Sequence, residues 1–77
     1  KYVDAITILE EATKLQKGVA AVHYHLGLAY LQTQQIEKGL KQLEAAFSLE
    51  ERFREVAKSE DLGIIQKIPE FQQLVNK

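Results

Sequence analysis

The order of apolar and polar residues along the chain predicts a series of helices. In the first stretch, apolar residues recur at intervals of three residues, at Val3, Ile6, Leu9, Ala12 and Leu15. This spacing places them on one face of an amphipathic helix. Gly18 follows the stretch, and glycine is a typical residue just beyond a helix C-terminus. The first helix is therefore expected to span residues 2–16.

The second stretch, residues 20–33, has apolar side chains on two sides of the expected helix. One side carries Val22, Leu26, Ala29 and Tyr30, and the other carries Tyr24, Leu28 and Leu31. A helix that is apolar on two faces is expected to lie between two neighbours. The polar residues QTQQ interrupt the pattern, so this helix is expected to end near Gln34.

The helical period resumes over residues 36–49, after which the chain is expected to bend between residues 50 and 52. Ser59 precedes two acidic residues, a pattern typical of a helix start because the hydroxyl caps free N–H groups and the acids favour the positive end of the helix dipole. Pro69 suits the first position of a helix. The segment PEFQQLVN is therefore expected to form a short helix that packs on the others.

An internal repeat emerges when residues 2–17 are laid over residues 36–51. The aligned pairs are Ile6 with Leu40, Leu9 with Leu43, Glu10 with Glu44, Ala12 with Ala46, and Leu15 with Leu49. The offset between the two segments is 34 residues. A unit of this length with two helices matches a tetratricopeptide repeat, which is about 34 residues long.

The family's residue pattern is present in the second and third stretches, at Leu26, Gly27, Tyr30, Gly39, Leu43 and Ala46. On these residues the chain resembles the tetratricopeptide repeat (TPR) family. The resemblance implies an all-α fold built from antiparallel helix pairs in a right-handed superhelix. Three positions depart from the pattern: His23 replaces the usual tryptophan, Gln34 the usual glycine and Glu51 the usual proline.

The resemblance divides the single domain of residues 1–77 into three parts. Residues 20–53 match one complete repeat, and residues 1–18 are similar to the second helix of a preceding repeat whose first helix is absent. Residues 54–77 resemble the capping helices that close many TPR arrays, a likeness carried by Ala57, Asp61, Leu62, Pro69 and Phe71. The absence of an initiating methionine suggests that the chain is a fragment.

Gly27 lies inside an expected helix, where glycine costs roughly 1 kcal/mol relative to alanine. In a pair of antiparallel helices, small residues at Gly27, Gly39 and Ala46 would allow the two axes to approach closely. We therefore expect another helix to lie against Gly27.

Composition argues against several kinds of function. Ten basic and eleven acidic residues leave no basic field for nucleic acid, and no apolar run approaches the roughly 20 residues that span a bilayer. There is no cysteine, and the two histidines, His23 and His25, point to different sides of a helix and cannot bind one metal together. No phosphate-binding loop or catalytic motif occurs. We therefore expect the chain to be no enzyme and to bind no cofactor. The sequence does not indicate its cellular compartment.

Function is implied by the resemblance: TPR domains bind partners in a concave groove lined by the first helix of each repeat. When the family's groove positions are carried over to this chain, the expected groove residues are Ala21, Tyr24, His25, Leu28, Leu31 and Gln32. A protein or peptide partner is expected, bound through apolar contacts, and Tyr24 and Leu28 replace the lysine and asparagine that clamp a terminal carboxylate in some relatives. The same apolar residues could instead pack against a missing or neighbouring repeat.

Two other roles remain open at this point. The chain could be a purely structural C-terminal cap of a larger repeat protein or enzyme. It could also self-associate into a homo-oligomer through exposed repeat faces, because fewer than three repeats are seldom stable alone.

Overall fold

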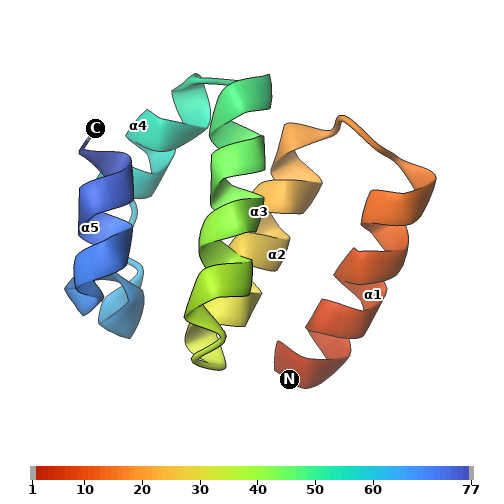
Figure 1. Cartoon of the computed structure of the whole chain (residues 1–77), viewed down its shortest axis with the longest axis horizontal. Helices are drawn as coiled ribbons and strands as arrows, with labels where there is room; N and C mark the ends of the chain where they lie inside the picture. Colours follow the sequence, from red (N-terminus) through yellow and green to blue (C-terminus); the bar gives the residue numbers. More distant parts are fainter. Residues whose placement is uncertain (1, 77) are drawn as a thin grey trace.

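The computed structural model describes residues 2–76, and over that range the chain is all-α without a β-strand. Its elements are α1 (Tyr2–Leu15), α2 (Ala20–Gln32), α3 (Ile36–Leu49), α4 (Arg52–Ser59), the 3₁₀ turn η1 (Gly63–Lys67) and α5 (Pro69–Val75). Helices α1, α2 and α3 run side by side in alternating directions (Figure 1). Residues 52–76, the C-terminal segment, pack on α2 and α3, on the side away from α1.

The predicted ends of the first three helices are confirmed to within one residue. Gly18 has φ +84°, the left-handed conformation expected after a helix. Gln34 has φ +66°, although it is not a glycine. The N–H of Gln35 donates to the carbonyl of Tyr30 over 2.9 Å in the same turn. The tight turn therefore forms with a glutamine, where the TPR pattern usually has a glycine.

The helix start predicted at Ser59 is wrong. Ser59 is the last residue of α4, and its hydroxyl donates to the carbonyl of Val56 over 3.2 Å. Two residues later, the carboxylate of Asp61 accepts the N–H of Gly63 over 3.3 Å. This local bond and the positive φ of Gly63, +63°, favour a turn over a regular helix. A helix does start at Pro69, as the sequence predicted.

Glycines from α2 and α3 meet where these two helices cross. A Cβ atom added to Gly27 would lie 2.8 Å from Cγ of Leu43, and one added to Gly39 would lie 2.9 Å from the carbonyl oxygen of Gly27. Carbon atoms in contact prefer separations of about 3.5–4.0 Å, so neither glycine leaves room for a side chain. The expectation that another helix lies against Gly27 is confirmed.

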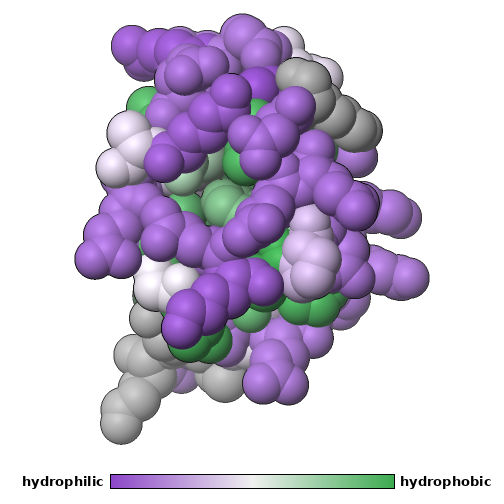
Figure 2. Space-filling model, turned by 90° about the vertical axis from the view of Figure 1, so that its left-hand side faces the viewer, coloured by the Kyte–Doolittle hydropathy of each residue, from purple (hydrophilic) through white to green (hydrophobic). Residues whose placement is uncertain are grey.

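Two clusters of buried side chains form the core. The smaller one joins α1 to α2 and consists of Ile6, Leu26, Ala29 and Tyr30. The larger one joins α2 and α3 to the C-terminal segment and consists of Tyr24, Leu31, Leu43, Ala46, Phe47, Ala57, Ile65, Phe71, Leu74 and Val75. The C-terminal segment therefore completes the core, and its outer face is mostly polar (Figure 2).

Candidate functional site

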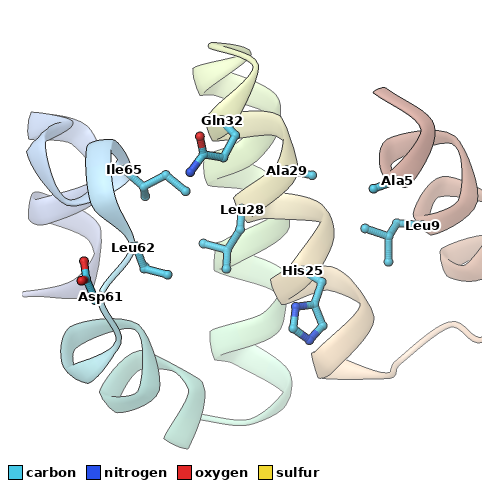
Figure 3. Close-up of a pocket in the computed structure, with 9 residues that line it drawn as sticks. All are labelled: Ala5, Leu9, His25, Leu28, Ala29, Gln32, Asp61, Leu62 and Ile65. Atoms are coloured by element: carbon cyan, nitrogen blue, oxygen red, sulfur yellow. The ribbon is translucent and has the colours of Figure 1, made fainter. Parts of the chain in front are cut away.

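An open groove of about 410 Å³ lies between α1, α2 and the loop that leads into η1, and we call it the α1–α2 groove. Its lining residues are Ala5, Leu9, His25, Leu28, Ala29, Gln32, Asp61, Leu62 and Ile65. Figure 3 shows Leu9 directed from α1 toward α2, and Leu62 and Ile65 directed from the opposite wall toward Leu28. Six of the nine lining residues are apolar, so the groove exposes a mainly apolar surface.

Helix α2 forms the floor of the groove because His25, Leu28, Ala29 and Gln32 are spaced by three, one and three residues, which places them on one side of a helix. Helix α1, which forms one wall of the groove, is held in place by contacts with α2. Ile6, 8% exposed, packs against the smaller cluster of the core, and the hydroxyl of Tyr30 donates to the carboxylate of Glu10.

Three of the six groove residues predicted from the sequence line the α1–α2 groove. These are His25, Leu28 and Gln32, whereas Ala21 is half-buried and is not among the lining residues. The structure contradicts the expected exposure of Tyr24 and Leu31, each of which is only 1% exposed. Almost none of either side chain is therefore accessible to a partner while the C-terminal segment is in place.

The C-terminal segment explains this correction. The ring of Tyr24 lies 5.1 Å from that of Phe53, and its hydroxyl donates to the carboxylate of Glu60 over 2.7 Å. Leu31 belongs to the same cluster as Ile65 and Phe71. Both residues therefore pack as the alternative interpretation expected, but against this chain's own C-terminal segment rather than another repeat.

The remaining lining residues were not predicted from the sequence: Ala5, Leu9, Ala29, Asp61, Leu62 and Ile65. A signal for two of them existed in the internal repeat. Ala5 and Leu9 correspond in that repeat to Gly39 and Leu43, which lie against α2. This face of α1 could therefore have been recognised as one suited to contact with another helix.

The histidines lie in different surroundings. Nδ1 of His23 is 2.7 Å from Oε1 of Gln42, and the side chain is half-buried between α2 and α3. His25 is exposed at the groove, with its ring 5.6 Å from that of Tyr24. In the part of the chain that the structure describes, no cluster of three potential ligands could hold a metal ion. None of the described helices combines the length and apolar character needed to cross a membrane.

Two tyrosine hydroxyls tie α2 to its neighbours and remain protonated at ordinary pH. Burial raises the pKa of Tyr30 to about 12, helped by its hydrogen bond to Glu10 and by the charge of that carboxylate. Burial likewise raises the pKa of Tyr24, and Glu60 adds to the effect in the same two ways. Both hydroxyls therefore act as hydrogen-bond donors that fix α2 in place.

The raised pKa of Tyr30 predicts a loss of stability in strong alkali. The pKa is about 12 in the folded chain, and an unfolded tyrosine has a pKa near 10. Between these values the unfolded chain releases the proton and the folded chain keeps it, so the free energy of unfolding falls as the pH rises from about 10 to 12. Urea titrations from pH 8 to 12 would measure this fall.

Tyr30→Phe is the matched variant for this titration, because it keeps the ring and removes the titrating hydroxyl. It should be less stable than the natural chain below pH 10 and should lose less stability above it. If the stability of the two proteins changed with pH in parallel, folding would not raise the pKa of Tyr30, and the prediction would be wrong.

Comparison of the chain with protein-family models, with curated proteins and with solved structures found no match in any of the three. The comparisons therefore assign the chain to no family. The groove's geometry and chemistry are what remain to support a function.

Proposed function

We propose that this chain is a protein-interaction module of the TPR type that binds a protein or peptide partner in the α1–α2 groove. The internal repeat and the close contact between Gly27 and Gly39 support a repeat of helix pairs. The observation that carries the proposal is the groove itself, whose lining is mainly apolar and includes three polar residues, His25, Gln32 and Asp61.

The groove's chemistry suits binding through apolar contact. Covering its leucine, isoleucine and alanine side chains with a partner would remove apolar surface from water, which favours association. The few polar groups in the lining can orient a partner, as in other apolar binding grooves. Relative to the groove expected from the sequence, the proposed site is shifted toward α1 and away from Tyr24 and Leu31.

The test is a capture experiment with the immobilised chain and lysate of the source cells, run in parallel with two variants. Leu9→Glu places a charge in the groove, and Ile8→Glu places the same charge on the neighbouring side chain, which is 68% exposed and outside the groove. Circular dichroism first establishes that both variants fold. We expect partners that the natural chain and Ile8→Glu retain and that Leu9→Glu loses.

The same experiment can reject the proposal. If the natural chain retains no protein above an empty-resin control, or if Leu9→Glu retains the same proteins as Ile8→Glu, the groove is not a binding site. Asp61→Lys gives a second test at an exposed position outside the core. Loss of the partner with Asp61→Lys would support binding even if Leu9→Glu failed to fold.

A structural role is the second candidate, and the burial of Tyr24 and Leu31 beneath the C-terminal segment favours it. Repeat arrays need a terminal unit with a polar outer face, and the C-terminal segment presents such a face (Figure 2). In this role the segment seals the core and the groove binds no separate protein. The capture experiment separates the two roles.

Self-association is the third candidate, because α1 exposes large apolar side chains. Ile8 is 68% exposed and Leu15 is 82% exposed. A second copy could cover them, which would lower the apolar surface in contact with water. Light scattering at increasing concentration decides this point, since a constant monomeric mass would rule out a homo-oligomer formed through α1.

A further inference from the structure

The faces of α1 and α3 that correspond in the internal repeat have different surroundings. On α3, Gly39, Leu43 and Ala46 are buried beneath α2, and Leu43 and Ala46 are 0% exposed. Their counterparts one repeat earlier, on α1, are half-buried: Ala5, Leu9 and Ala12. Two of these counterparts, Ala5 and Leu9, line the α1–α2 groove. The groove therefore lies against the face of α1 that corresponds to the helix-binding face of α3.

The contact between α2 and α3 shows what kind of element such a face accepts. Leu43 lies so close to Gly27 that a Cβ atom there would be 2.8 Å from Cγ of the leucine. A helix fits because it presents a glycine to the leucine. An equivalent helix on α1 would need a small residue opposite Leu9, and it would run antiparallel to α1, as α2 does to α3 (Figure 1).

Charge adds a second requirement for the occupant. Asp61 is exposed at the groove, and its carboxylate accepts the N–H of Gly63 over 3.3 Å, which leaves further acceptor sites open. Among the described residues that line the groove there is no lysine or arginine, and the ion pairs found within residues 4–76 do not include Asp61. A positively charged side chain would complement this end of the groove.

We infer that the α1–α2 groove binds an amphipathic α-helix of a partner protein, antiparallel to α1. Its apolar face presents a glycine or alanine to Leu9, and a lysine or arginine lies beside Asp61. The inference rests on the proposed binding function and specifies its partner: a basic amphipathic helix, in contrast to an extended peptide or an acidic helix.

The probe is a synthetic peptide with the sequence of residues 19–33, VAAVHYHLGLAYLQT, because this is the helix that the equivalent face of α3 binds. Two versions are made, one with His23→Lys and His25→Lys and one with His23→Glu and His25→Glu. Each is titrated into the complete 77-residue chain while the methyl NMR signals of Leu9, Leu28 and Leu62 are followed. We expect the lysine peptide to shift these signals and to bind about fivefold more tightly than the glutamate peptide at low salt.

Variants of the chain test each contact. Leu9→Glu should weaken binding of the lysine peptide by about tenfold or more, whereas Thr7→Glu should change it by less than about twofold, because Thr7 is exposed and corresponds in the internal repeat to Lys41, which is exposed although α2 packs on α3. Asp61→Asn should remove most of the difference between the two peptides. If Leu9→Glu does not fold, Ala5→Glu replaces it, since Ala5 also lines the groove and glutamate is a good helix former. A peptide carrying Gly27→Leu should bind at least about tenfold more weakly.

Several results would overturn the inference. It fails if neither peptide shifts the groove signals at a concentration of about 1 mM, which corresponds to the weakest binding of interest. It also fails if Leu9→Glu and Thr7→Glu bind the lysine peptide alike, or if Asp61→Asn leaves the difference in affinity between the two peptides unchanged. Capture of a partner that requires Leu9, together with failure of both peptides, would leave the proposed function standing and remove the basic helix as its ligand.

Discussion

Gly39→Leu is expected to lower the free energy of unfolding by about 3 kcal/mol, at the upper end of the usual cost of overpacking a core. Even a single Cβ atom at this position would lie 2.8 Å from Cγ of Leu31 and 2.9 Å from the backbone oxygen of Gly27. Leu31 is 1% exposed and is packed in the larger cluster of the core, so moving it would disturb its neighbours. A backbone oxygen inside a helix cannot rotate away, so α2 and α3 would have to separate.

Helix propensity opposes this loss but does not cancel it. Leucine is the better helix former, and replacing a glycine inside a helix gains roughly 1 kcal/mol. Lys41→Leu is the matched control, because it adds the same side chain at an exposed position of α3. Urea denaturation followed by circular dichroism measures both variants. Equal midpoints for Gly39→Leu and the natural chain would show that the two helices do not meet at their glycines.

Phe71→Ala is expected to cost about 3–5 kcal/mol, the usual penalty for truncating a buried phenylalanine. Phe71 is 2% exposed and lies in the cluster that joins the C-terminal segment to α2 and α3. Truncation would leave a cavity beside the side chains that this segment covers, including Tyr24 and Leu31. A chain of this size has little stability to lose, so the C-terminal segment should loosen first.

Denaturation and native-state hydrogen exchange together test this expectation. Amide protons of α5 should exchange much faster in Phe71→Ala than in Gln73→Ala, which alters an exposed residue of the same helix. Binding of a hydrophobic dye should rise as Tyr24 and Leu31 become accessible. If the variant melts like the natural chain and α5 keeps its protection, the C-terminal segment is not an integral part of the core.

The sequence by itself determined the elements of the first half of the chain. Helix ends followed from local chemistry, because the apolar period stops at Gly18 and again at the polar residues around Gln34. The close contact at Gly27 could be predicted because a glycine inside a helix needs a compensating contact. These features depend on neighbouring residues or on the internal repeat, and both can be read along the chain.

Only the tertiary structure decided which side chains the groove contains. Tyr24 and Leu28 are four residues apart on one helix, yet the first is buried and the second lines the groove, because the C-terminal segment folds back over one side of α2. Asp61 enters the site through a turn that the sequence pattern predicted as a helix start. The physical reason is that periodicity fixes which residues share a face, whereas long-range packing of apolar side chains fixes what covers that face.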